Sequence, residues 1–346
     1  MTVSNTLFSS LFTDPEVAAL FSADAMLDHM ADYERALTQA LADTGAVPAD
    51  MAAKALERME TFTPDIDAVT HATGRDGAPV PAFVRQLKDH VGDAESTVHI
   101  GATSQDLLDT STVLSLRGLS DLLSTRLDGL IAALHTMRDT HGANSLMGRT
   151  RMQAALPITV ADRVTTWAEP LARHLDRLAQ LRPRIEVVQH GGPVGLRDGA
   201  DVARRLADHF RLRLTETPWH AMRDGMVEYG NWLSLVSGSL GKIGQDIALM
   251  AQQGVDAITL SGGGESSAMA HKQNPVRAEL LVTLARHNAA LVGGLNHALI
   301  HEQERSGSAW ALEWMILPQM AETTGKALTE ARALIGQVEA IGDTHQ

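Results

Sequence analysis

The chain has 346 residues, of which 44% are hydrophobic but only 4% aromatic, and it contains no cysteine. This length is enough to bury a sizeable core, and few aromatic residues beside many Ala and Leu favour helices over β-sandwiches. The lack of cysteine excludes disulfides, thiolate nucleophiles and Cys-bound metals. The formal charge of −13 argues against non-specific binding to nucleic acid.

The N-terminal segment carries no visible targeting signal. Residues 1–13 contain no basic region followed by an apolar run, so no signal peptide is predicted. No stretch approaches the roughly 18 apolar residues that a membrane span requires. We therefore expect a soluble cytoplasmic protein with no membrane contact.

Residues 1–98 are predicted to form a small helical domain, because apolar residues recur there at steps of three and four. Gly45 stands just past a helix end, where glycine commonly stops a helix. The segment Thr70–Pro81 contains two glycines and two prolines and is predicted to be a loop. The expected helices cover 15–21, 25–44, 51–59 and 83–91.

Residues 99–346 are predicted to form a bundle of five long helices, which makes the fold class all-α. The stripe from Leu233 to Met250 follows an unbroken 3-4-3-4-3 pattern, typical of helices packed nearly parallel. His287 falls on the fourth stripe and is expected to be buried, and Pro318 should kink the fifth helix. The apolar stripes run over 116–137, 160–188, 233–250, 276–299 and 310–341, and a short helix is expected at 198–210.

The polar run from Ser261 to Val276, S-G-G-G-E-S-S-A-M-A-H-K-Q-N-P-V, separates the third and fourth long helices. Its three glycines allow sharp bends, and Pro275 suits the first turn of the following helix. Hydroxyls, an ammonium and an amide beside a helix start can hold an anion. The plain alternative is a solvated Gly/Ser turn. A nucleotide-binding P-loop is excluded because no G-K-[ST] follows the glycines.

Within this run, S-S-x-M-x-x-K-x-N-P resembles the mobile catalytic loop of the fumarase/aspartase superfamily. Two further strings resemble the superfamily's first and second signature blocks: H-x-G-A-T-S-Q-D from His99 to Asp106, and G-R-T-R-M-Q from Gly148 to Gln153. The flanking sequence is most similar to the bacterial carboxymuconate cycloisomerases of that superfamily. The resemblance covers residues 7–341 and implies a chain that lacks the relatives' C-terminal helical domain.

The resemblance implies a role for each matching residue. Ser266 would transfer the proton at the carbon α to a carboxylate, and Lys272 and Asn274 would bind the carboxylate that becomes charged. A small polycarboxylate is the implied substrate, and neither a metal nor a cofactor is implied. The expected substrate-binding residues are His99, Thr103, Ser104, Arg149, Thr150, Gln153, Ser267, Met269 and Arg305.

Simpler roles remain open for several of these residues. Thr103 and Ser104 suit a helix N-cap, and Arg149 and Arg151 suit ordinary surface charges. Arg151 also stands where fumarases carry a catalytic histidine, so the general acid/base of relatives has no counterpart in this block. Smaller departures from the relatives are Ala154, Glu265 and Ala270. Outside the three strings, His190 suits capping or packing, and His220 and Arg223 are expected substrate contacts.

Three functions are compatible with these strings. The first is an intramolecular cycloisomerase that lactonises a carboxymuconate in the breakdown of protocatechuate. An internal carboxylate attacks without being deprotonated, so a missing histidine at 151 and 154 is tolerable. The second is a fumarate-releasing lyase acting on adenylosuccinate or argininosuccinate, and the third is an inactive helical homologue. Under the first two, the resemblance implies a homotetramer whose active sites collect loops from three subunits.

Overall fold

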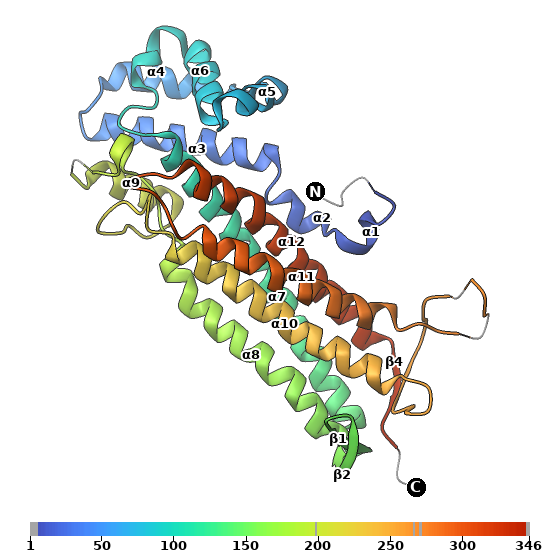
Figure 1. Cartoon of the computed structure of the whole chain (residues 1–346). Coiled ribbons are helices and arrows are strands. Elements are labelled where there is room, and N and C mark those ends of the chain that lie inside the picture. Colours follow the sequence, from blue (N-terminus) through green and yellow to red (C-terminus); the bar gives the residue numbers. More distant parts are fainter. Residues whose placement is uncertain (1–5, 198, 266, 270–271, 344–346) are drawn as a thin grey trace.

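The computed structural model describes residues 6–197, 199–265, 267–269 and 272–343, and these are mostly helical (Figure 1). A small group of helices sits at one end of a bundle of long helices. The helices are α1 (Ser9–Phe12), α2 (Pro15–Ala19), α3 (Ala23–Asp43), α4 (Ala49–Met59), α5 (Ile66–Asp76), α6 (Val80–Val91), η1 (Gly92–Thr97), α7 (Ser104–His141), α8 (Val160–Ile185), η2 (Gly192–Val194), α9 (Asp201–Phe210), α10 (Asp224–Met250), α11 (Val276–His297) and α12 (Gly307–Gly336). The strands are β1 (Ser145–Thr150), β2 (Gln153–Thr159), β3 (Ile258–Leu260) and β4 (Val338–Ile341).

The N-terminal helices agree with the predicted ones except at Thr70–Pro81. That segment was predicted to be a loop, and this is wrong: α5 runs to Asp76 and α6 begins at Val80. The break is confined to a few residues, with Gly77 in the left-handed conformation at φ 74° as the cap of α5. Pro81 lies in the first turn of α6, where its missing N–H is not needed. Glycine and proline here mark two helix ends rather than an extended loop.

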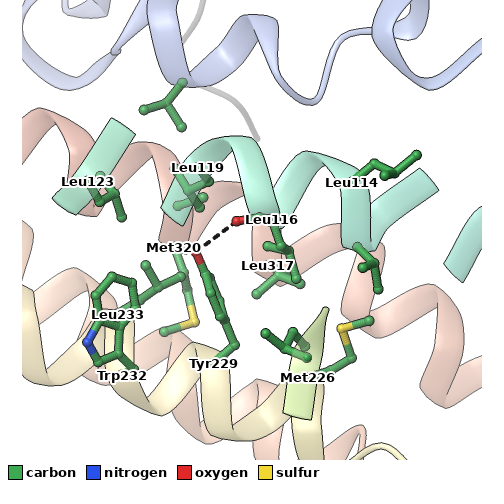
Figure 2. Close-up of a cluster of buried hydrophobic side chains, with 14 of the residues drawn as sticks. Leu114, Leu116, Leu119, Leu123, Met226, Tyr229, Trp232, Leu233, Leu317 and Met320 are labelled. Carbon is green, nitrogen blue, oxygen red and sulfur yellow. Dashed lines mark hydrogen bonds between the residues drawn. The ribbon is translucent and has the colours of Figure 1, made fainter. Parts of the chain in front are cut away.

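The five long helices α7, α8, α10, α11 and α12 pack side by side, which confirms the predicted bundle (Figure 1). Their apolar stripes point inward, because burying that surface is the main favourable term in bundle formation. Figure 2 shows leucines of α7 meeting Met226, Tyr229 and Trp232 of α10 and Leu317 and Met320 of α12. The Tyr229 hydroxyl lies in this cluster and donates to the Leu116 carbonyl at 3.3 Å.

Two small antiparallel sheets were not anticipated. β1 and β2 form a hairpin between α7 and α8, and β3 pairs with β4. The fifth long helix was expected to reach Ile341 but ends at Gly336, since residues 338–341 pair with β3 instead. His287, expected in the core, is exposed; its neighbour Asn288 is buried and donates to Ser237 and Thr324. In the described part of the chain, no helix has both the length and the apolarity to cross a membrane.

Candidate active site

The N-terminal end of α7 is held together by one buried carboxylate. Asp106 is fully buried and accepts the Thr103 N–H at 3.0 Å, so Thr103 is the N-cap expected from its residue type. The same carboxylate accepts the N–H groups of Gly191 and Gly192 at 2.8 and 3.0 Å. His220 Nε2 lies 2.8 Å from it on a fourth side. Asp106 therefore ties the start of α7 to two distant loops.

Arg305 reaches this cluster through Gln105, the residue before Asp106. Its Nε donates to Gln105 Oε1 at 3.1 Å, and its Nη2 donates to the Pro193 carbonyl at 3.3 Å. Gln105 is itself fully buried and fixed by a bond from its Nε2 to the His220 carbonyl. No carboxylate of the described residues forms an ion pair with Arg305. The terminal edge of its guanidinium is thus free to grip a carboxylate bidentately.

His99 faces the same region and is oriented by a buried carboxylate from α3. Its Nδ1 lies 2.5 Å from Glu34 Oε1, and its backbone N–H donates to Glu34 Oε2 at 3.0 Å. The His99 backbone is left-handed, at φ 62°, which is uncommon for a residue with a side chain. Its side chain is 17% exposed, while the Glu34 side chain is 0% exposed.

Three other polar residues near this end are structural. His190 is buried with its Nδ1 3.0 Å from the Tyr33 hydroxyl, and burial lowers its pKa, so packing is confirmed as its role. The expectation that Arg223 contacts substrate is wrong. Its 2% exposed guanidinium is fully engaged by Asp109 and Glu313, at 2.5–3.0 Å. Burial alone would lower the pKa of Arg223, but Asp109 and Glu313 raise it above its usual value. His220 is equally buried against Asp106, which leaves it no surface for a substrate.

Backbone hydrogen bonds join the two ends of the predicted catalytic loop and form a narrow neck before α11. Gly264 and Asn274 exchange two backbone hydrogen bonds, at 2.9 and 3.0 Å. Gly262 takes φ 69°, whereas Gly264 is needed for close packing, because a Cβ there would lie 2.4 Å from Val276 Cγ2. Lys272, Ser267 and Met269 are exposed on the loop and Asn274 is half-buried at the neck. Ser266 lies outside the described residues.

The second signature block forms the tip of the β1–β2 hairpin. Thr150 pairs with Gln153 across a two-residue turn made by Arg151 and Met152, at φ 48° and 67°. Such turns require positive φ at both central residues and normally use Asn or Gly. Arg149, Thr150 and Gln153 are all exposed there. No carboxylate within the described ranges pairs with Arg149 or Arg151.

The predicted site residues therefore fall into three groups, and one chain does not bring the group at the start of α7 together with the other two. α7 has 38 residues and separates Thr103 from the hairpin. At 1.5 Å per residue this helix is about 57 Å long. α11 likewise separates Asn274 from Arg305, and its 22 residues span about 33 Å. Figure 1 shows the hairpin and the α9 region at opposite ends of the bundle.

Sequence reasoning missed Glu34, Gln105 and Asp106 as organising residues. For Glu34 a signal existed, because it falls on the apolar face of its helix between Met30 and Leu37. A lone acidic residue on a buried stripe needs a partner. For Gln105 and Asp106 nothing in the spacing identified their partners, which come from residues about 85 to 200 positions later.

Comparison with known proteins defines the class to which this architecture belongs. The sequence profile of a family described as lyase matches residues 13–288. The chain belongs to this lyase family, the fumarase/aspartase superfamily.

Particular members resemble the chain over nearly its whole length. The 3-carboxy-cis,cis-muconate cycloisomerase of Pseudomonas aeruginosa is 38% identical over 97% of this chain and 76% of its own. The crystal structure of the 3-carboxy-cis,cis-muconate lactonizing enzyme from Pseudomonas putida superimposes with a TM-score of 0.89 at 36% identity, covering 97% of this chain and 77% of that one. A fumarate lyase from Mesorhizobium sp. BNC1 gives a TM-score of 0.88 at 33% identity, covering 94% and 76%.

Proposed function

We propose that the protein is a cycloisomerase that converts 3-carboxy-cis,cis-muconate to 4-carboxymuconolactone in the breakdown of protocatechuate, and that it acts in the cytoplasm. The observation that carries this proposal is the set of cations without carboxylate partners among the described residues of an acidic chain. Arg149 and Lys272 lie on the second block and on the catalytic loop, and Arg305 contacts the first block through Gln105. Three separate cationic side chains suit a substrate with three carboxylates. The similarity to the cycloisomerases of two Pseudomonas species supports the same substrate.

The chemistry follows from the charge that develops during lactonisation. One substrate carboxylate oxygen forms a bond to a double-bond carbon, and the displaced electron pair moves onto another carboxylate as an aci-carboxylate. Lys272 and Asn274 would stabilise that extra charge, which preorganised donors do better than water. The Ser266 hydroxyl would then give a proton to the neighbouring carbon. A trianion becomes a dianion, so each turnover takes up one proton.

A homotetramer with sites shared between subunits is part of this proposal. In one chain, the start of α7 and Arg305 lie tens of ångströms from the hairpin and from the loop before α11, so loops of different copies would have to meet to form one site. Both ends of the bundle also expose large apolar side chains beside the predicted site residues, as expected of surfaces that pack against another copy. Those side chains are Met147, Met152 and Leu156 at the hairpin, and Ile100, Val194, Leu196 and Ile300 at the other end.

The proposal is tested by adding purified protein to 3-carboxy-cis,cis-muconate and following the loss of its absorbance. We expect turnover at micromolar protein, and a loss of about 10²-fold or more for Ser266→Ala if this hydroxyl transfers the proton. Ser261→Ala is the matched control, since its hydroxyl donates to the Gln337 carbonyl at the base of the loop. No absorbance loss with the unmodified protein would rule out the proposed substrate.

A fumarate-releasing lyase is the second candidate, and the similarity to the Mesorhizobium fumarate lyase favours it. Such an enzyme usually protonates its leaving group, and Arg151 occupies the place of the histidine that would serve. Release of fumarate from adenylosuccinate or argininosuccinate, measured beside the carboxymuconate assay, separates the two. An inactive homologue would turn over none of these substrates.

A further inference from the structure

His99, an expected substrate-binding residue, is paired with Glu34, a carboxylate outside the three strings. Glu34 is a fully buried carboxylate whose hydrogen-bond partners, within the described residues, both belong to His99. The backbone N–H of His99 accounts for one oxygen and its ring Nδ1 for the other. This double grip holds His99 in its left-handed backbone conformation. Strain that the surroundings maintain in this way is concentrated at functional positions.

The geometry fixes which ring nitrogen faces outward. A carboxylate at 2.5 Å from Nδ1 requires a proton between the two atoms. When the Glu34–His99 pair holds only that one proton, its net charge is −1 and Nε2 carries a bare lone pair, which repels a carboxylate oxygen. Nε2 presents a proton to an anion only when the Glu34–His99 pair carries one proton more. The protonated His99 ring then lies between the buried Glu34 carboxylate and any bound carboxylate.

We propose that the Glu34–His99 pair is a proton-coupled carboxylate subsite, which takes up one proton when a polycarboxylate binds. Lactonisation likewise consumes one proton per turnover. Glu34 acts through His99 and is a positioning residue. The inference rests on the proposed function only in taking the bound anion to be a polycarboxylate.

Other titratable groups surround the pair without duplicating it. Tyr33 on α3 is buried and its pKa is raised well above its usual value, first by burial and then by Asp106 and Glu34. His190 faces Glu34 from the loop before α9 and is kept neutral by burial. Asp106 is fully engaged by its four donors. Arg197, on the same loop as His190, is a further cation whose pKa is lowered by burial.

The test measures proton uptake during binding of tricarballylate, a tricarboxylate with no double bond to react. The measurement is made at about pH 8, well above the ordinary imidazole pKa of about 6.5. Calorimetry in two buffers of different ionisation enthalpy then gives the number of protons taken up on binding. We expect about one proton for the unmodified protein and up to about a tenfold loss of affinity per pH unit. Glu34→Gln should bind with no uptake, because an amide can donate to Nδ1 and leave the proton on Nε2.

Two further variants keep the test decisive. His99→Asn tolerates the left-handed backbone and should lose both the proton uptake and at least about tenfold in affinity if one charge-assisted hydrogen bond is removed. His209→Gln removes an exposed histidine, 3.2 Å from Asp32, and should leave the uptake unchanged. No tricarballylate binding, or equal uptake in the unmodified protein and Glu34→Gln, overturns the inference. Uptake that depends on Glu34 in a protein that does not lactonise carboxymuconate would instead reject the proposed function alone.

Discussion

At the level of single residues, His174 shows how burial in the bundle fixes a protonation state. It lies on the inner face of α8, 3% exposed, with Nε2 2.8 Å from Ser239 Oγ. Arg177 Nη1 lies 3.2 Å from its Nδ1, and a guanidinium only donates. Nδ1 must therefore keep a lone pair and Nε2 the proton. Burial, with Arg177 and Arg173 adding to it, lowers the pKa of His174 to about 4.

This pKa predicts a specific dependence of stability on pH. The unfolded chain protonates His174 near its ordinary pKa of about 6.5, whereas the folded chain does so only near 4. Folding is therefore penalised progressively as the pH falls from about 6.5 to about 4, and the penalty is absent above that range. His174→Gln should lose less stability than the unmodified protein between pH 8 and pH 5, measured by urea unfolding at one protein concentration. Equal losses would contradict the prediction.

At the level of elements, the contact between α10 and α11 depends on glycine. A Cβ on Gly244 would lie 2.5 Å from the Ala278 carbonyl and 2.8 Å from Leu281 Cβ, so the two helices touch backbone to backbone there. Ala278 is in the first turn of α11, which directly follows the predicted catalytic loop. The position of that loop is thus set by how closely α11 approaches α10.

Gly244→Ala should push α11 away and lower both stability and turnover. Overpacking of this kind costs about 1–3 kcal/mol, partly offset by the better helix propensity of alanine. Gly238→Ala is the matched control in the same helix, since a Cβ there meets nothing within 4 Å of this chain. That variant should be neutral or more stable by up to about 1 kcal/mol. Thermal unfolding measures the stability of each variant, and the carboxymuconate assay measures its turnover. Equal stability and equal turnover of the two variants would contradict the prediction.

At the level of the whole molecule, α7 holds its start about 57 Å from the hairpin at its other end. If all three groups of site residues serve one substrate, as we propose, the start of α7 must come from a different copy than the hairpin and the loop before α11. Two inactive variants, Arg305→Ala and Lys272→Ala, should then restore each other when co-expressed. Random mixing leaves roughly a quarter of the sites with both residues intact.

The recovered activity is the measurement that checks this arrangement. Each variant expressed alone should remain inactive in the carboxymuconate assay, and the co-expressed sample should regain up to about a quarter of full turnover. The control is a sample in which every chain carries both substitutions. It should remain inactive. Absence of recovery in a correctly assembled mixture would show that both residues serve within one subunit.

The sequence alone was sufficient for the architecture of the bundle. Apolar residues at steps of three and four predicted the five long helices, since that spacing places them on one face of each helix. It failed where glycine and proline cluster at 70–81, because the same residues end helices and build loops. It also placed His287 in the core, one position from Asn288, which is the buried residue. A shift of one position rotates a side chain by about 100° around the helix.

The tertiary structure alone decided how the site is organised. His99 and Arg305 were expected from the resemblance, but their partners Glu34 and Gln105 were not, since hydrogen bonds between segments 65 and 200 residues apart leave no local pattern. Arg223 was misjudged for the same reason, as its two carboxylate partners are distant in sequence. Helical periodicity depends on near neighbours and can be read along the chain. Charge pairing in a core depends on which helices meet, and that is decided only when the bundle packs.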